Sequence, residues 1–293
     1  MKFILLIPPI LSLNIWIFLV LFTLTKVPFS QISVSCSTDS IGSHIYFVHG
    51  YGGNESQFFD MITYLNNSDL FNNEVNRTIV PLFFNFYEKY YNLGMTKTQI
   101  HNIQGGISTF GLDFFYQLSQ THESAEISIV AHSLGGLIVR EMLFNHQREL
   151  ELSNNTIIRV ITLGTPHLGI KIVDHPLRKQ FSWFFSDNRK TLVAQSVTSS
   201  SPFLNKINQD PVKYMKGIDW YFVAGVSLNP LILLAQETIF NGVPRDGIVD
   251  CKSVLAIGLN LVQINRVILQ KDHEQLICDP YKQESYKYIK KWL

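Results

Sequence analysis

A serine at position 133 stands in a pattern that could do nucleophilic chemistry. In Ile127–Arg140, a β-branched run leads through Ala-His-Ser-Leu-Gly-Gly into an amphipathic stretch. The pattern matches the nucleophile elbow G-x-S-x-G, a strand-to-helix turn that exposes the serine hydroxyl, with Ala131 in place of the first glycine. The helix N-terminus that follows favours the negative charge that develops on attack. A glycine-rich turn of a nucleotide-binding sheet is the alternative, and the flanking strand and helix patterns weigh against it.

A second glycine-rich turn could supply hydrogen-bond donors for the same reaction. The segment Ile45–Gly53 is an apolar run that ends in His-Gly-Tyr-Gly-Gly. In enzymes with a nucleophile elbow, one oxyanion donor is the N–H after the nucleophile and the other comes from such a loop. We therefore expect the backbone N–H groups of Tyr51 and Leu134 to hold an oxyanion. His49, directly before the turn, is expected to bond loop backbone rather than to act as a base.

A histidine base is expected downstream of the serine, because the chain order in this architecture is Ser, then Asp or Glu, then His. The histidines after Ser133 are His146, His167, His175 and His273. Among these four, His273 alone follows a late apolar run, Arg266–Leu269, in a short loop. The sequence therefore predicts His273 as the base.

The acid that orients this base is expected after the preceding apolar run, Trp220–Ala224. The segment Arg245–Asp250 reads Arg-Asp-Gly-Ile-Val-Asp. Asp246, before a glycine, has the turn chemistry expected of an exposed loop carboxylate. Asp250 is its rival, and Asp272 beside the histidine is expected to be a solvated loop charge.

The elements that must position these residues follow from the hydrophobic pattern. Six short β-branched or aromatic runs alternate with helix-length stretches, which predicts a parallel α/β sheet with right-handed crossovers. Near-continuous apolar runs are typical of strands buried on both faces. The runs are His44–Val48, Thr78–Phe86, Ile127–Ala131, Ile157–Leu163, Trp220–Ala224 and Arg266–Leu269.

Composition narrows the class of protein. The 293 residues include 24 Lys plus Arg and 23 Asp plus Glu, so the net charge of +1 excludes binding to nucleic acid through bulk positive charge. Hydrophobic residues make up 46%, which excludes disorder over most of the length. Charged residues make up only 16%, against about 25% in ordinary soluble domains. A membrane segment or an unusually apolar surface would explain the difference.

The N-terminus is one source of the low charge. No charged residue lies between Lys2 and Lys26, and this stretch is longer than the core of a secretory signal. We expect residues 1–35 to be a signal-anchor that attaches the protein to a membrane, or else a cleaved signal peptide. Residues 36–293 are then one catalytic domain. Cys36, Cys251 and Cys278 form no metal-binding pattern, and a Cys251–Cys278 bridge or two buried free thiols are both open.

The motifs together resemble a known family. They are Val48–Gly53, Ala131–Gly136, the Gly-Thr-Pro-His-Leu-Gly stretch of Leu163–Gly169, Asp246–Val249 and Asp272–His273. This set is similar to the α/β-hydrolase lipases, and within them to the GPI inositol-deacylase-like group. The resemblance implies an α/β-hydrolase fold, with a mostly parallel sheet flanked by helices. It also implies Ser133 as nucleophile, Asp246 as acid and His273 as base. That group is membrane-anchored, with its hydrolase domain in the lumen of the endoplasmic reticulum.

The predicted function is that of a serine carboxylic-ester hydrolase that works through an acyl-enzyme, with no metal or cofactor. The expected substrate is a lipid ester, such as the acyl-inositol of a GPI anchor or a glycerolipid. The alternatives are a thioesterase on acyl-protein or acyl-carrier substrates, and an inactive hydrolase fold that serves as a binding protein. An insertion at about 167–219 is expected to cap the site. Its aromatic run Gln180–Phe185 would form a lipid-contacting lid or pack on the core. With a signal-anchor or a cleaved signal at residues 1–35, the enzyme is expected to be membrane-anchored or secreted, with its catalytic domain outside the cytoplasm.

Overall fold

The computed structural model describes residues 43–67, 80–121, 126–152, 156–171, 191–259, 261, 264–279 and 283–293. The chain divides into two compact units, Met1–Asp39 and Ser40–Leu293, and every described residue belongs to the second. The predicted signal-anchor at residues 1–35 and the aromatic run Gln180–Phe185 lie outside the described residues. No helix in the described ranges combines the length and the apolar character that a membrane crossing needs.

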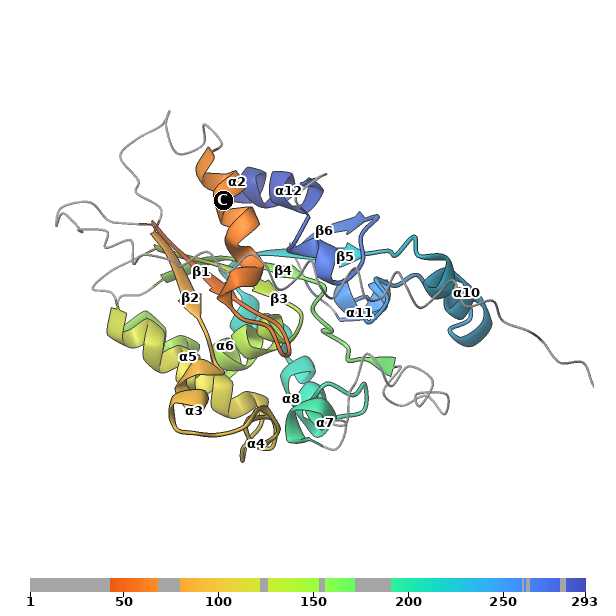
Figure 1. Cartoon of the computed structure of the whole chain (residues 1–293). Helices are drawn as coiled ribbons and strands as arrows, with labels where there is room; N and C mark the ends of the chain where they lie inside the picture. The colour runs from red at the N-terminus through yellow and green to blue at the C-terminus, as the bar shows by residue number, and fades with distance from the viewer. Residues whose placement is uncertain are drawn as a thin grey trace, which may run out of the picture. The chain divides into compact units, whose positions relative to one another are not determined.

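A parallel sheet of six strands forms the centre of the second unit, in the order β2-β1-β3-β4-β5-β6 (Figure 1). The six strands coincide with the six predicted runs to within two residues at each described end, so the predicted parallel α/β class is confirmed. Their bounds are β1 Ser43–Val48, β2 Val80–Phe84, β3 Glu126–His132, β4 Thr156–Leu163, β5 Asp219–Gly225 and β6 Ile264–Leu269.

Burial along the strands corrects one expectation. The central strand β3 is buried from Ile127 to His132, as expected for a strand that is covered on both faces. Strand β6 is different, because it lies at the edge of the sheet and Ile268 is 55% exposed. The prediction that every run is buried on both faces is therefore wrong for β6. A short, largely apolar run such as Arg266–Leu269 does not distinguish an edge strand from a central one.

Helices cover both faces of the sheet. In Figure 1, α2 and α12 lie on one face and α5 and α6 on the other. Met61 and Leu65 from α2 and Ile289 from α12 pack on the first face. Helices α5 and α6 pack on the second face, and every residue of α6 from Leu134 to Leu143 is buried. The longer helices are α2 Phe59–Asn67, α5 Ile107–Thr121, α6 Leu134–Leu152, α8 Pro202–Gln209, α10 Pro230–Ile239 and α12 Glu284–Trp292. The short elements are η1 Glu55–Phe58, α3 Glu88–Asn92, α4 Lys97–His101, α7 Leu192–Ser196, α9 Pro211–Met215, α11 Cys251–Val254 and η6 Glu274–Leu276.

The described part of the predicted cap insertion is helical and is fastened to α6. Arg140 of α6 is 1% exposed and donates through its guanidinium to the Tyr214 hydroxyl at 2.7 Å and to Asn208 Oδ1 at 2.6 Å. The same guanidinium lies 3.3 Å from the carbonyl oxygen of His167, at the start of the insertion. A buried cation satisfied by several oxygen atoms fixes both ends of this segment to the body.

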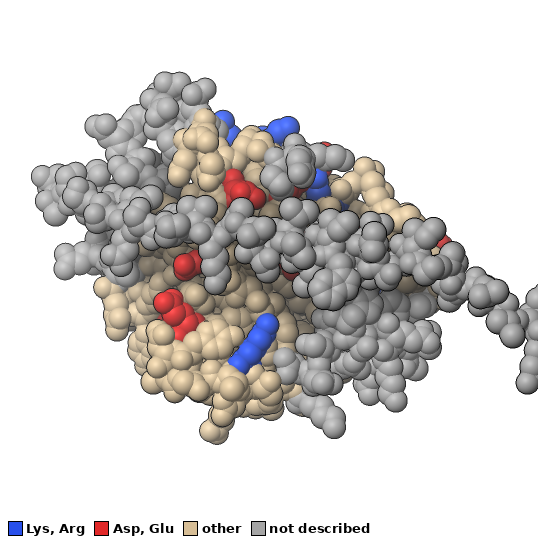
Figure 2. All heavy atoms as spheres, in the orientation of Figure 1, with Lys and Arg blue, Asp and Glu red and all other residues tan. Residues whose placement is uncertain are grey.

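The two described cysteines are free thiols, so the alternative of a Cys251–Cys278 bridge is wrong. Cys251 is buried, with its Sγ 3.4 Å from the carbonyl oxygen of Gly225, whereas Cys278 is exposed. Among the described residues visible in Figure 2, acidic and basic side chains are scattered among uncharged ones and form no patch of a single sign. The mixed distribution of charged side chains agrees with the net charge of +1.

Candidate active site

The turn between β3 and α6 carries Ser133 in a strained conformation. Its φ of +51° lies in the left-handed region, which non-glycine residues adopt rarely and mostly where function requires it. The N–H of Ser133 donates to the carbonyl oxygen of Leu163 at 2.8 Å. A Cβ at Gly135 would lie 2.4 Å from the carbonyl oxygen of Val48, so glycine is required where α6 packs on the end of β1. These are the features of a nucleophile elbow.

The glycine-rich loop after β1 lies directly against this serine. A Cβ at Gly50 would lie 2.9 Å from the Cβ of Ser133. The loop closes as a tight turn, in which the N–H of Gly53 donates to the carbonyl oxygen of Gly50 at 3.2 Å. Leu134 is the first residue of α6, so its N–H is among the four that have no partner within the helix. Tyr51 follows Gly50 in the turn, so the structure brings both predicted oxyanion residues to the serine.

His49 contacts loop backbone, as expected from its place before the turn. It is 1% exposed, and its Nδ1 lies 2.9 Å from the carbonyl oxygen of Gly50, to which it must donate. Its Nε2 lies 3.2 Å from Asn85 Oδ1. Burial lowers the pKa of His49, although its two hydrogen bonds act in the opposite direction. The ring therefore braces the turn through its contacts with Gly50 and Asn85.

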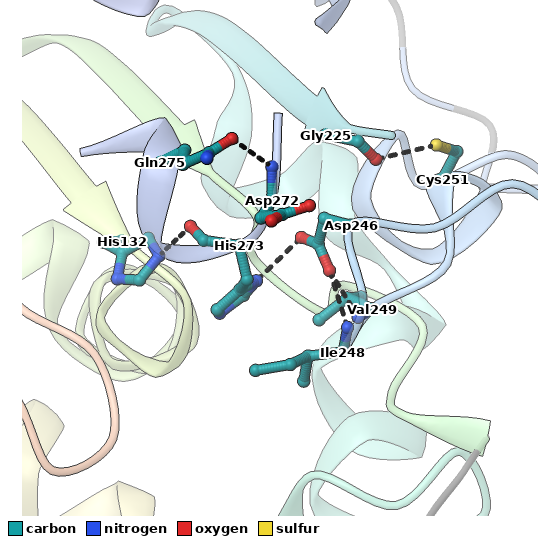
Figure 3. A network of polar contacts seen from close by, with 9 residues as sticks. All are labelled: His132, Gly225, Asp246, Ile248, Val249, Cys251, Asp272, His273 and Gln275. Carbon is teal, nitrogen blue, oxygen red and sulfur yellow. Dashed lines mark hydrogen bonds and ion pairs between the residues drawn. The ribbon is translucent and has the colours of Figure 1, made fainter. Parts of the chain in front are cut away.

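A buried acid–base pair lies at the carboxyl ends of β5 and β6 (Figure 3). His273 Nδ1 is 2.7 Å from Asp246 Oδ2, and the side chains are 5% and 0% exposed. The other carboxylate oxygen, Oδ1, accepts the N–H groups of Ile248 at 3.0 Å and Val249 at 2.8 Å. The N–H of His273 also donates to the carbonyl oxygen of Asp246 at 3.0 Å. Because the carboxylate is held from both sides, it fixes the imidazole in one orientation.

The charge balance around His273 favours its protonated form. Burial lowers its pKa, but the charge of Asp246, the hydrogen bond to Asp246 and the charge of Glu274 outweigh burial, so the pKa lies above the ordinary value of 6.5. An imidazole that is easily protonated and whose Nδ1 is occupied can accept a proton only at Nε2.

The two other aspartates that the sequence brings into consideration lie elsewhere. Asp250 is the N-cap of α11, and its Oδ1 accepts the N–H of Ser253 at 2.9 Å. Asp272 lies in the turn after β6, where its backbone N–H donates to Gln275 Oε1 at 3.0 Å. The carboxylate bonded to His273 is that of Asp246, and the expectation that it is exposed is wrong, because its side chain is buried.

Ser133 and His273 meet at one backbone segment, the end of β4. Leu163 accepts the N–H of Ser133, and a Cβ at the next residue, Gly164, would lie 2.9 Å from Cε1 of His273. In the described part of the chain no hydrogen bond joins Ser133 to His273. Hydrogen bonds of this kind are often long in free enzymes and tighten when substrate binds.

Two residues that contribute to the site were not found from the sequence. His132, just before the serine, has its Nε2 3.1 Å from the carbonyl oxygen of His273, and the two rings lie 4.7 Å apart. Lys271, two residues before His273, is 3% exposed and forms a buried ion pair with Asp279. The first could have been found from its place in the elbow, whereas no pattern pairs the second with its partner. Among the described residues, no group of three or more His, Cys, Asp or Glu is placed to hold a metal ion.

Comparison with known proteins assigns the family. Residues 42–221 match the family model described as "Putative serine esterase (DUF676)", which is more than half of the chain. The chain belongs to this serine esterase family. The matched part contains Tyr51, Ser133 and Leu134, whereas Asp246 and His273 lie beyond it. No curated protein matches the sequence.

Solved structures show the fold of this serine esterase. The mature form of Bacillus licheniformis lipase BlEst2 is similar with a TM-score of 0.53 and 17% identity, over 86% of this chain and 93% of that one. The lin2722 product of Listeria innocua is similar with a TM-score of 0.51 and 16% identity, over 85% of this chain and 92% of that one. The RedJ thioesterase of the prodiginine pathway in Streptomyces coelicolor has a TM-score of 0.51 and 13% identity, over 100% of this chain and 98% of that one. At these identities the likeness is one of fold, and the predicted α/β-hydrolase fold is confirmed.

Proposed function

We propose that this serine esterase hydrolyses carboxylic esters through a covalent acyl-enzyme, with Ser133 as nucleophile, His273 as base and Asp246 as acid. The observation that carries the proposal is the buried His273–Asp246 pair beside a serine that is held at φ +51°. A serine on an ordinary strand–helix connection has no need of this strained geometry.

Each step can be assigned to named atoms. Nε2 of His273 takes the Ser133 proton as the hydroxyl attacks the ester carbonyl, while Nδ1–H remains bonded to Asp246. The backbone N–H groups of Tyr51 and Leu134 receive the oxyanion. His273 then protonates the leaving alcohol, which departs and leaves the acyl group on Ser133. Water repeats the sequence on the acyl-enzyme and restores the serine.

We propose a lipid ester as the substrate, either the acyl-inositol of a GPI anchor or a glycerolipid. The support is the resemblance of the motifs to the GPI inositol-deacylase-like lipases and the apolar surface beside the acid. Leu228, Leu231 and Leu234 are 55%, 77% and 61% exposed, and a Cβ at Gly247 would lie 3.0 Å from Ile232 of the same segment. Exposed leucines next to a catalytic loop favour a substrate with an acyl chain.

We propose that residues 1–35 attach the enzyme to a membrane, with the catalytic unit outside the cytoplasm or, in a eukaryote, in the lumen of the endoplasmic reticulum. The support is the uncharged stretch between Lys2 and Lys26 and the same resemblance.

The proposal is tested with a fluorophosphonate probe and chromogenic esters. The wild-type protein is expected to be labelled and to hydrolyse long-chain p-nitrophenyl esters, and Ser133→Ala to lose both. Ser201→Ala is the matched control: it also removes a serine hydroxyl, but one that caps α8 in the insertion and has no role in the proposed reaction. Absence of labelling in the wild type would identify an inactive hydrolase fold. Faster turnover of a palmitoyl thioester than of the oxygen esters would identify a thioesterase.

A further inference from the structure

The turn that carries Tyr51 is bonded to two residues for which the reaction scheme has no role. The N–H of Gly52 donates to the hydroxyl of Tyr87 at 2.9 Å, and this hydroxyl lies 2.7 Å from Nε2 of His101. Tyr87 follows β2 at the N-terminus of α3, and His101 is the last residue of α4. A chain of two hydrogen bonds therefore runs from the turn into the body of the protein.

The direction of both hydrogen bonds is fixed by the chemistry of the groups. A backbone N–H can only donate, so the Tyr87 oxygen accepts from Gly52. Burial raises the pKa of Tyr87, so the phenol keeps its proton and donates it to Nε2 of His101. Burial and the charge of Lys97 lower the pKa of His101 to about 4, so its Nε2 lone pair is available at neutral pH.

The imidazole of His101 also holds the side chain of Tyr51. The two rings are stacked with their centroids 4.1 Å apart and their planes 21° apart. His101 is fully buried, and among the residues that the structure describes its Nδ1 has no hydrogen-bond partner. An apolar side chain would fill this place without a buried polar atom. What histidine adds here is the acceptor for Tyr87 together with a flat ring for Tyr51.

These contacts hold Tyr51 from both sides. The Tyr87 hydroxyl fixes the peptide that follows Tyr51, and His101 fixes its side chain. The preceding peptide is fixed at Gly50, which lies against Ser133 and accepts from both Gly53 and His49. The N–H of Tyr51 is therefore left little freedom of direction. Donors of an oxyanion hole stabilise the transition state because they are oriented before the reaction begins.

We propose that Tyr87 and His101 are a positioning pair for the oxyanion hole: they orient the Gly50–Gly53 turn so that the Tyr51 N–H points at the developing oxyanion. The proposal rests on the proposed esterase function. It adds two residues, far apart from Ser133 and His273 in the sequence, on which the transition state depends and substrate binding does not.

The test begins with Tyr87→Phe, which removes one hydroxyl and keeps the ring. We expect kcat on a p-nitrophenyl ester to fall on the order of 10-fold, less than the 100-fold or more that loss of an oxyanion donor costs. KM is expected to stay the same, because the turn acts on the transition state. The matched control is Tyr90→Phe on α3, whose hydroxyl donates to Asp113 at 2.5 Å, away from the turn. Its kcat is expected to equal that of the wild type.

A transition-state analogue separates positioning from general loosening. A trifluoromethyl ketone forms a tetrahedral adduct with the serine and places an oxyanion in the hole. Its inhibition constant should therefore rise in Tyr87→Phe by the same factor by which kcat/KM falls. A fall in kcat/KM with an unchanged inhibition constant, or an equal fall in Tyr90→Phe, would overturn the proposal.

Two substitutions of His101 give an independent test. His101→Gln keeps an acceptor for Tyr87, whereas His101→Leu removes it, so the glutamine variant should retain the larger kcat. Equal kcat in both would overturn the proposal, even if Tyr87→Phe did not fold. A wild-type protein without turnover would overturn the esterase function as well, whereas normal turnover in every variant would overturn the positioning role alone.

Discussion

At the scale of single residues, the site depends on how one carboxylate is held. Asp246 accepts two backbone N–H groups on one oxygen and the imidazole on the other, so it remains in place whether His273 is neutral or charged. Burial of His273 alone would lower its pKa, and the neighbouring carboxylate reverses that effect. In the proposed mechanism, the same interaction stabilises the imidazolium that forms during proton transfer.

The pH dependence of turnover follows from this balance. The base must be neutral to accept a proton, so kcat/KM should rise with pH through the pKa of His273, with a midpoint above 6.5. In Asp246→Asn the charge is gone and burial remains, so the midpoint should move to lower pH. The value of kcat should also fall by about 10⁴-fold, because the amide favours the wrong tautomer. Initial rates across the pH range measure both effects, and an unmoved midpoint would contradict this account.

The corresponding substitution at Asp250 serves as the control. Asp250→Asn keeps an N-cap for α11, because asparagine caps as well as aspartate. Its midpoint and kcat should remain those of the wild type. The sequence places both aspartates after the same strand, and chain order alone cannot separate them. What separates them is that Asp250 caps a four-residue helix, and a helix that short leaves no periodic pattern.

At the scale of elements, the loop that follows β6 is fastened to α12 by buried polar contacts. Lys271 pairs with Asp279, and Glu284 of α12 lies 3.8 Å from the same ammonium group. The N–H of Asp279 donates to the hydroxyl of Tyr286 at 2.8 Å, and that hydroxyl donates to the carbonyl oxygen of Ile277. These contacts close both ends of the loop that carries His273.

Breaking the ion pair from one side should destabilise the protein. Lys271→Met leaves the buried carboxylate of Asp279 without its ammonium partner, which should lower the free energy of unfolding by about 3 kcal/mol. The double variant Lys271→Met, Asp279→Leu removes both charges and should recover most of that loss. Urea unfolding of the two single variants and the double variant gives the coupling. A double variant as unstable as the sum of the single ones would show that the pair does not act as a unit.

The strands could be predicted from the sequence, whereas the contacts that hold the His273 loop to α12 could not, for a physical reason. In a run such as Ile157–Leu163 most side chains are apolar and most are buried, so the hydrophobic pattern indicates a strand. No sequence pattern pairs Lys271 with Asp279, because their pairing depends on where α12 comes to lie. The same holds for Tyr87 and Gly52, which meet because β2 ends beside β1.

At the scale of the whole molecule, the order of the strands explains why chemistry gathers at one edge. All six strands are parallel, so the loops after β1, β3, β4, β5 and β6 leave from the same edge of the sheet. Ligands of open α/β sheets bind outside the carboxyl ends of the strands, where such loops meet. Residues as far apart in sequence as Tyr51 and His273 are neighbours of Ser133 for this reason. Each of these loops lies in the unit Ser40–Leu293.

Removal of residues 1–39 should therefore leave the catalytic unit intact. Both hydrophobic cores and every proposed catalytic residue belong to Ser40–Leu293, so a chain that starts at Ser40 should keep the Tm of the full chain. Its kcat/KM on a short, water-soluble p-nitrophenyl ester should also be unchanged. Against a long-chain ester in phospholipid vesicles, the full chain should be the faster enzyme if residues 1–35 hold it at the membrane. Equal rates on vesicles would contradict the membrane role of that segment, and loss of turnover on the soluble ester would contradict the independence of the catalytic unit.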